Sequence, residues 1–350
     1  MPQKEVEMQK IDFVLPWVDG SDEAWLELKR KYERSSYNMS RSDVEANGEI
    51  RYSDCGLLRY WFRAVERFAP WVNRIFFVTC GQKPDWLDES HPKLRLVNHE
   101  DYIPAEYLPT FQSNTIELNL HRIADLSEQF VLFNDDVFLL RPVDPEFFFR
   151  KGLPIIPCEL AIPFWLGYNN CSRVIVNNSA ALKLGLDVNH LVWKNMWKYV
   201  DVRALGFRRA TKNFLVFAIN RFLIPGSFGH LPQSHLKSTF AEMWRAVPQI
   251  MDTTSRNRFR ADDCVNQWLA CAWNMVSGTF FPAHEKQRGY FCTLKRNNIA
   301  QICNVIRRPS SPMMGLTESE CDPVMDVDYC IQEISKTFDE LLPEKSSFEK

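Results

Sequence analysis

The sequence predicts an α/β fold built on a mostly parallel sheet, and three features lead to this prediction. Four short apolar runs, at residues 11–18, 74–79, 94–97 and 129–133, have the length and composition of buried strands. Segments with helical spacing or turn signals lie between them, an alternation typical of βαβ units. The length of 350 residues favours one large α/β domain with insertions or two closely packed lobes.

The first apolar run, IDFVLPWV at residues 11–18, is predicted to be a buried strand that ends in a polar turn. The turn reads Asp-Gly-Ser-Asp at residues 19–22. Ser21 or Asp22 can cap a helix that we expect to run to about residue 35.

The rest of the chain continues this alternation of helices and strands. Pro70 is expected to stop the second helix, and the fourth strand, QFVLF, ends in Asn134-Asp135-Asp136. The further predicted elements are a helix at 54–68, strands at 74–79 and 94–97, a helix at 114–126, a strand at 129–133, and helices at 238–247, 262–273 and 329–342.

The chain is predicted to divide into three parts. Residues 1–150 form the first half of a nucleotide-binding α/β core. Residues 151–229 have weaker periodicity and mix Pro, Asn and aromatic residues, so we assign them to an inserted, mainly helical lobe on the acceptor side. Residues 230–350 form the second half of the core, with a terminal helix and tail.

The composition excludes several classes of protein. With 42 basic and 44 acidic residues and a net charge of −2, the chain has no basic field for nucleic acid. The first residues lack the apolar core of a signal peptide and no apolar stretch is long enough to span a bilayer, so a cytoplasmic protein is expected. Ten cysteines without a C-x-x-C pair indicate reduced thiols. P-loop, G-x-G-x-x-G, G-x-S-x-G and H-E-x-x-H motifs are absent from the sequence.

Carboxylates follow two of the predicted strands. Asp19 and Asp22 come after the first strand, and Asp135 and Asp136 come after the fourth. Ligands of open α/β sheets bind beyond the carboxyl ends of strands, and adjacent aspartates suit Mg²⁺ or Mn²⁺ held against a nucleotide diphosphate. The alternative is a solvated turn with Asp as a cap.

Histidines and arginines gather later in the sequence. His230 and His235 lie in GHLPQSHLKS, and SRNRFRADD brings Arg256, Arg258 and Arg260. Arginine clamps phosphate oxygens, and histidine can exchange a proton near neutral pH. The alternative is a surface salt-bridge cluster with the neighbouring aspartates.

Four blocks of the sequence resemble the Stealth family of sugar-phosphate transferases. The first is DFVLPWVDGSD, and the second runs from residue 58 to 140 and includes LPTFQSNTIELNLHRI and LSEQFVLFNDDVFL. The third is HLPQSHLKSTF together with RFRADDCVNQWLACAW. The tail FDELLPEKSSFEK is also similar, but Thr317 and Glu318 stand where the family pattern has Asn and Asp.

This resemblance implies a glycosyltransferase-A-like core and a specific reaction. Sugar-1-phosphate would pass from a nucleotide diphospho-sugar, expected to be a UDP-sugar, to a hydroxyl of a glycan or lipid-linked glycan during capsular polysaccharide synthesis. Two alternatives stay open: a glycosyltransferase that releases nucleoside diphosphate, and a non-catalytic sugar-binding assembly protein.

The resemblance also implies site residues. Asp135 and Asp136 would hold Mg²⁺ or Mn²⁺, Arg260 would bind phosphate, and His230 or Asp136 would assist the acceptor hydroxyl. The implied catalytic residues are Asp136, His230, Arg260 and Asp263. The implied substrate-binding residues are Asp19, Gly20, Ser21, Arg51, Ser113, Glu117, His121, Arg122 and Glu318.

Residues 200–228 suggest contact with a membrane. They interleave bulky apolar side chains with Arg203, Arg208, Arg209, Lys212 and Arg221. Such a mixture suits the headgroup region of an anionic membrane. The alternative is that the apolar residues pack inside the lobe while the arginines meet donor phosphate or solvent.

Overall fold

The computed structural model describes residues 10–33, 52, 56–158, 160–161, 170–219, 224–225, 229–284, 288–295, 297–317 and 327–350. Its centre is a five-stranded sheet of order β10-β4-β1-β2-β3. Four strands are parallel, and β10 pairs antiparallel with β4 at one edge. The strands are β1 (Ile11–Pro16), β2 (Ile75–Thr79), β3 (Leu94–Asn98), β4 (Gln129–Leu132) and β10 (Gln233–Leu236). The predicted α/β class and mostly parallel sheet are confirmed.

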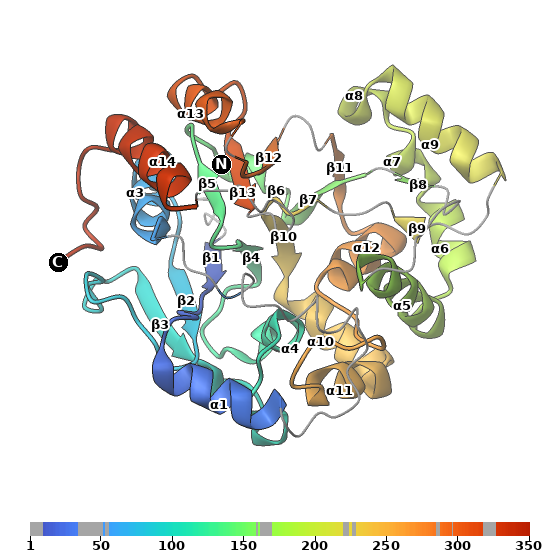
Figure 1. Ribbon diagram of the computed structural model, residues 1–350. Helices are drawn as coiled ribbons and strands as arrows, with labels where there is room; N and C mark the ends of the chain where they lie inside the picture. Colours follow the sequence, from blue (N-terminus) through green and yellow to red (C-terminus); the bar gives the residue numbers. More distant parts are fainter. Residues whose placement is uncertain are drawn as a thin grey trace, which may run out of the picture.

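Alternate residues of the central strands enter two different apolar cores. Phe13 and Leu15 of β1 point into a core with α3 (Leu58–Phe68), α13 (Ile299–Arg307) and α14 (Val327–Leu341). Val14 points to the other face, into a core with α10 (Lys237–Ala246), α11 (Pro248–Arg256) and α12 (Trp268–Ser277). Figure 1 shows the sheet between these helices. Because both faces are covered, the strands have continuous apolar runs instead of alternation.

Smaller sheets extend the central one. The strands β5 (Val137–Leu139), β12 (Gly289–Thr293) and β13 (Met313–Thr317) form a sheet of order β12-β13-β5. A second has the order β11-β7-β6, and β8 pairs with β9. These strands are β6 (Phe149–Arg150), β7 (Leu153–Pro157), β8 (Leu160–Ala161), β9 (Ile224–Pro225) and β11 (Phe281–Ala283).

The segment between β8 and β9 is helical where the structure describes it. It carries α5 (Asn170–Gly185), α6 (Val188–Lys194), α7 (Met196–Tyr199), α8 (Val202–Leu205) and α9 (Phe207–Ile219). Leu182 and Tyr199 belong to the same apolar core as α10 and α12. The predicted helical character is therefore confirmed, and its helices share a core with the rest of the chain. The three-part division itself stays a prediction.

Several element boundaries differ from the prediction. The helix expected at 114–126 is the short α4 (Ser113–Leu118) followed by a 3-10 turn, with the Asn119 amide donating to the carbonyl of Thr115. The helix expected at 262–273 begins only at Trp268, because residues 260–267 form a loop. The first helix is α1 (Glu23–Glu33), and the 3-10 turns are η2 (His99–Asp101), η3 (Ala105–Tyr107), η4 (Leu120–Arg122) and η5 (Pro145–Phe147).

Seven of the described cysteines are free thiols: Cys80, Cys158, Cys264, Cys271, Cys292, Cys303 and Cys330. Among the described residues, no helix is long and apolar enough to cross a membrane.

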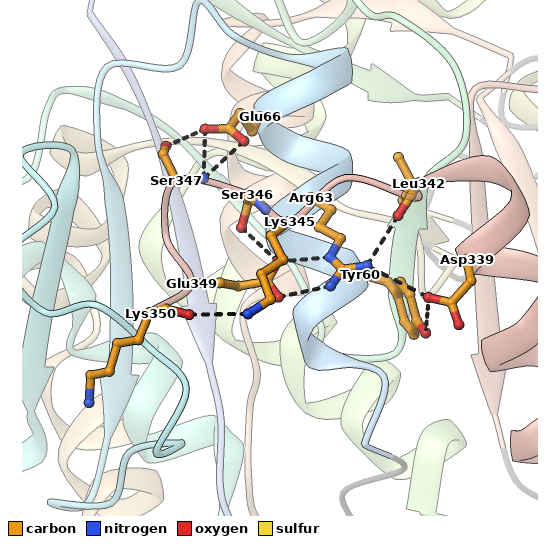
Figure 2. A network of polar contacts seen from close by, with 10 residues as sticks. All are labelled: Tyr60, Arg63, Glu66, Asp339, Leu342, Lys345, Ser346, Ser347, Glu349 and Lys350. Carbon is orange, nitrogen blue, oxygen red and sulfur yellow. Dashed lines mark hydrogen bonds and ion pairs between the residues drawn. The ribbon is translucent and has the colours of Figure 1, made fainter.

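The tail after α14 is fixed to α3 by a buried arginine (Figure 2). The Arg63 guanidinium donates from Nε and Nη2 to the two carboxylate oxygens of Glu349, at 2.7 and 2.9 Å, and from Nη1 to the Leu342 carbonyl at 3.1 Å. Burial raises the pKa of Glu349, but hydrogen bonds from Arg63 and Ser346 leave it below its usual 4.5. The stabilisation is therefore present above the unfolded-state pKa and is lost as the pH falls through the folded-state pKa.

We predict that Arg63→Met lowers the free energy of unfolding by about 3 kcal/mol at pH 7, because it leaves a buried carboxylate without its partner. Urea denaturation measures this. Arg67→Met is the matched control: its exposed guanidinium, one turn along α3, donates only to the Leu341 carbonyl, so we expect a loss below about 1 kcal/mol. Equal small losses in both variants would contradict the prediction.

Candidate active site

The strand pairing brings residues from distant parts of the chain to one edge of the central sheet, the edge formed by the carboxyl ends of its parallel strands. β1 and β4 are parallel, with Val14 opposite Leu132, so the loops that follow both strands leave at the same edge. β10 is antiparallel, with Gln233 opposite Leu132, and the residues that precede it therefore start at that edge. The loop after β1, the Asp135–Asp136 pair and His230 therefore lie at the same end of the sheet, where ligands of α/β sheets bind.

The Asp135–Asp136 pair lies between the central sheet and the strand β5. The Leu316 N–H donates to the Asp136 carbonyl at 2.9 Å, which ties the pair to β13. The Oδ1 atom of Asp136 is buried and has no hydrogen-bond partner. Burial, with a smaller effect from the charge of Asp135, raises the pKa of Asp136 to about 8. Such a carboxylate is stabilised by a proton or by a cation.

The two aspartates of the loop after β1, Asp19 and Asp22, have different hydrogen-bond partners. The Asp19 carboxylate accepts hydrogen bonds from the Ser21 N–H and hydroxyl, at 2.9 and 2.6 Å. The backbone of Asp19 is also held by Gln82, which follows β2 and which the sequence analysis missed. Asp22 instead caps α1 by accepting from the Trp25 N–H, so it takes the structural role.

Gly20 is required by a close backbone approach. Its N–H donates to the Tyr52 carbonyl at 2.9 Å, and a Cβ at this position would lie 2.1 Å from that oxygen. The Tyr52 hydroxyl in turn donates to the Phe111 carbonyl at 2.8 Å. This chain of contacts connects the loop after β1 with the start of α4.

The helix α4 carries two polar side chains, Ser113 and Glu117, close to Arg260. The Arg260 guanidinium donates to the Ser113 hydroxyl at 3.1 Å. Burial raises the pKa of Glu117 to about 7, although the charge of Arg260 and a hydrogen bond from Ser113 lower it. The Phe111 N–H donates to the Arg258 carbonyl at 2.8 Å, which holds α4 against the loop that carries Arg260.

Only one of the three candidate arginines faces α4 in this way. Arg256 forms an exposed ion pair with Asp252 within α11. Arg258 donates to the Pro109 carbonyl at 2.6 Å and lies over the ring of Tyr32. The salt-bridge alternative therefore holds for Arg256, while Arg258 serves to connect two loops.

The two histidines of the GHLPQSHLKS segment have different environments. His230 is exposed, and its ring stacks on Phe291 with 4.8 Å between the ring centroids. His235 is fully buried between Phe130 and Phe240. Burial lowers the pKa of His235 to about 3 despite a nearby Gln267 side chain. It is a neutral core residue, and only His230 is available for chemistry.

The loop between α11 and α12 is held by its own polar residues and by α5. The exposed Asp263 accepts from the Asn257 amide at 2.8 Å. Asp262 forms an ion pair with Arg173, and the Asn177 amide donates to the Asp262 carbonyl at 2.7 Å. Sequence reasoning missed Arg173 because it lies in a helix far along the chain from this loop.

His121 and Arg122 lie in the turn after α4 and pack against Trp244 of α10. The Arg122 guanidinium lies 4.6 Å from the Trp244 ring, and its Nε donates to Asn119 at 2.9 Å. Burial, together with the charge of Arg122, lowers the pKa of His121 to about 4. Their role in substrate binding stays a prediction. Arg51 and Glu318 lie outside the described residues.

Comparison with known proteins relates the chain to a protein family. Models of the Stealth protein family match the chain, with conserved region 1 at residues 9–37 and conserved region 2 at residues 51–155. The capsular polysaccharide phosphotransferase WcwK of Streptococcus pneumoniae is 37% identical over 98% of this chain and 100% of that protein. The receptor polysaccharide phosphotransferase WefC of Streptococcus gordonii is 36% identical over 98% of this chain and 99% of that protein.

More distant proteins were also found. The exopolysaccharide phosphotransferase cps2G of Lactiplantibacillus plantarum is 32% identical over 97% of this chain and 96% of that protein. A structure of the galactosyltransferase LgtC with donor and acceptor sugar analogues aligns over 96% of both chains, with 10% identity and a TM-score of 0.39.

We predict that Glu117→Gln changes how stability depends on pH. The pKa of Glu117 is raised from 4.5 to about 7, so its favourable contribution is full below the unfolded-state pKa and is lost as the pH rises through the folded-state pKa. Glutamine removes that loss. The free energy of unfolding of the variant, relative to that of the unmodified protein, should therefore rise by at least about 1 kcal/mol from pH 5 to pH 8.

Urea denaturation at the two pH values measures this gain, with Glu106→Gln as the control because Glu106 is exposed in the turn η3. A difference between Glu117→Gln and the unmodified protein that is the same at both pH values would contradict the raised pKa.

Proposed function

The chain belongs to the Stealth protein family, and from this membership we propose that it transfers sugar-1-phosphate from a nucleotide diphospho-sugar to a hydroxyl of a carbohydrate acceptor. Its relatives are named as phosphotransferases of capsular, receptor and exopolysaccharides, and this chain is an enzyme of polysaccharide phosphotransfer. We expect a UDP-sugar as donor and a free or lipid-linked glycan as acceptor. The proposal is carried by the placement of the Asp135–Asp136 pair and His230 at the same edge of the sheet, and by Arg260, which contacts Ser113 of α4.

The Asp135–Asp136 pair fits a divalent cation. Asp136 has a buried, unpartnered Oδ1 beside a second carboxylate, and Mg²⁺ commonly takes one or two carboxylates together with phosphate oxygens. No group of three or more His, Cys, Asp or Glu side chains able to hold a metal occurs among the described residues, so the donor phosphates would complete the coordination. Mg²⁺ or Mn²⁺ bound there would neutralise charge on the diphosphate.

The protein groups divide the remaining work between binding and proton transfer. Arg260 would hold phosphate oxygens, supported by Ser113, and the loop of Asp19, Gly20 and Ser21 would contact the nucleotide. Asp263 would position the loop of Arg260. We assign the proton acceptor to His230, because it is exposed at the edge and Asp136 would be engaged in holding the cation.

The proposed reaction is a single nucleophilic displacement at phosphorus. The acceptor oxygen forms a bond to the β-phosphorus, and the bond from that phosphorus to the bridging oxygen of the nucleotide breaks. The hydroxyl proton passes to His230, and nucleoside monophosphate leaves with the bridging oxygen. Transfer of this kind depends on charge neutralisation and in-line positioning, which these residues can supply.

We predict that the purified protein, given a panel of nucleotide diphospho-sugars, a glycan acceptor and Mg²⁺ or Mn²⁺, releases nucleoside monophosphate. Excess EDTA should abolish turnover. Asp136→Asn should lower the rate by about 100-fold or more, because the cation that would neutralise the charge on the diphosphate is then bound less tightly. Chromatography of the nucleotide products measures both effects.

Asp252→Asn is the control and should keep its activity, because this partly exposed aspartate contacts Arg256 and Tyr107 and none of the proposed site residues. Release of nucleoside diphosphate would identify a glycosyltransferase instead. Undiminished turnover in EDTA would exclude the cation.

We also propose that the enzyme works while bound to an anionic membrane surface. Several bulky apolar side chains of α6, α7 and α9 are between 53% and 73% exposed: Trp193, Trp197, Phe207, Phe214 and Leu215. These helices lie together at one side of the molecule (Figure 1). Exposed apolar residues gathered in this way mark interaction surfaces.

The geometry of α9 supports this proposal. Phe207, Thr211 and Phe214 follow the spacing of one helix face and are exposed. The opposite face is anchored by Asn213, whose oxygen accepts from the Leu160 N–H and whose amide donates to the carbonyls of Cys158 and Tyr199. The exposed face of α9 is therefore held outward.

The charge on these helices supports an anionic partner. Lys194, Arg203, Arg208 and Lys212 are exposed beside the apolar residues. Asp201 is the only acidic residue of the sequence between 188 and 219, and its carboxylate caps α8. Each basic residue near an anionic membrane surface contributes about 1 kcal/mol. Arg221 and Phe222 of the predicted segment lie outside the described residues.

We predict that the protein cosediments with vesicles that contain anionic lipid and stays in solution with neutral vesicles, because both charge and apolar burial are needed. Phe207→Ser and the double variant Arg203→Glu/Arg208→Glu should each reduce binding about tenfold. Lys295→Glu, a charge reversal of an exposed residue outside these helices, is the control.

Equal sedimentation with both kinds of vesicle, or with all variants, would contradict the membrane surface. A dimer in light scattering that Phe207→Ser dissociates would assign the same face to a second copy of the chain.

A further inference from the structure

Two neighbouring strands next to the Asp135–Asp136 pair hold an exposed phenylalanine in a defined position. Phe291 of β12 lies opposite Gly315 of β13, and Gly315 lies opposite Val137 of β5. Val137 directly follows Asp136 in the chain. Phe291 is 39% exposed, so its ring packs at the edge of the site and not in a core.

Gly315 makes room for this ring. A Cβ at Gly315 would lie 2.4 and 2.7 Å from two carbons of the Phe291 ring and 3.4 Å from Val137. The ring therefore rests directly on the backbone of β13. Glycine inside a strand commonly marks such a close approach, because any side chain there would displace the neighbour.

The ring of Phe291 also stacks on His230. The two rings are nearly parallel, at 22°, with 4.8 Å between their centroids. Trp268 meets the same imidazole edge-on, with a centroid distance of 6.0 Å and an angle of 68°. An exposed histidine would otherwise sample several rotamers, so contacts with two aromatic rings restrict the orientation of the imidazole plane.

We propose that Phe291 is a positioning residue, which orients the imidazole of His230 toward the reacting hydroxyl, and that Gly315 sets the position of Phe291. The proposal deepens the proposed function and rests on the role that it gives to His230. Phe291 acts through His230 and transfers no proton itself. Misplacing a reacting group by about 1 Å can cost about 100-fold in rate, so an orienting contact of this kind affects turnover more than substrate binding.

The first test compares kinetic constants of variants at Phe291. Phe291→Leu should lower kcat by about 10-fold to 100-fold with KM changed less than about threefold, and Phe291→Tyr, which keeps the ring, should stay within about threefold of the unmodified enzyme. Tyr290→Leu is the matched control: its side chain is 40% exposed and its hydroxyl contacts Ser310. A rise in KM with kcat unchanged would overturn the proposal and make Phe291 a substrate contact.

The second test reads the orientation of His230 without using activity. Stacking on Phe291 shifts the ring proton signals of His230 in NMR spectra, and His230→Gln identifies these signals by removing them. In Phe291→Leu they should move toward the positions of an exposed histidine. Unchanged signals would overturn the proposal, whereas full activity of His230→Gln would overturn only the role given to His230 above.

The third test examines Gly315 by a double-mutant cycle. Gly315→Ala should lower kcat about 10-fold by displacing Phe291, and it should have little further effect in the Phe291→Leu background. Independent, multiplicative losses would show that Gly315 acts through Val137 and Asp136, and would remove it from the proposal. Denaturation of each variant confirms that it is folded.

Discussion

The pairing of β1 with β4 is the constraint on which the site depends. Their parallel register places both carboxyl ends at one edge, and the antiparallel β10 returns the chain to that edge. A slip of one residue in β1 would exchange Phe13 and Leu15 with Val14 between the two apolar cores. Burial on both faces thus fixes the register, and the register fixes which polar residues meet.

The polar groups at this edge oppose folding while the rest of the molecule favours it. Asp136 and Glu117 are carboxyl groups whose pKa values are raised by burial, a state that costs free energy near neutral pH unless a cation or proton compensates. The two apolar cores and the buried pair of Arg63 and Glu349 offset this cost. Stability is concentrated in the cores and at the tail, and the destabilised groups belong to the candidate site, as is common for functional groups.

The arginines illustrate how similar residues acquire different roles. Arg256 pairs within its helix, Arg258 connects two loops, and Arg260 faces Ser113 of α4. Arg256 ends α11, whereas Arg258 and Arg260 lie in the loop that follows it, so the three side chains have different neighbours. The α5 helix contributes to this arrangement by holding Asp262 with Arg173, so the helical segment supports the site although none of the sequence blocks lies in it.

The sequence by itself determined the α/β class, the central parallel strands and the location of candidate residues at strand ends, because buried strands and polar turns leave local patterns. It also indicated Gly20, Asp135, Asp136, His230 and Arg260 through the family resemblance. The local pattern alone did not separate His235 from His230, since a core position differs from a site only in its distant neighbours; the family resemblance selected Asp19 and His230, and the structure shows Asp22 as a cap and His235 in the core. Gln82, Arg173 and Phe291 become relevant only through contacts with residues far along the chain.

The short α4 and the late start of α12 were likewise decided by side-chain hydrogen bonds and loop packing, which helical periodicity does not record. Tertiary structure alone placed Phe291 between Gly315 and His230, because that contact depends on the strand order of β12, β13 and β5.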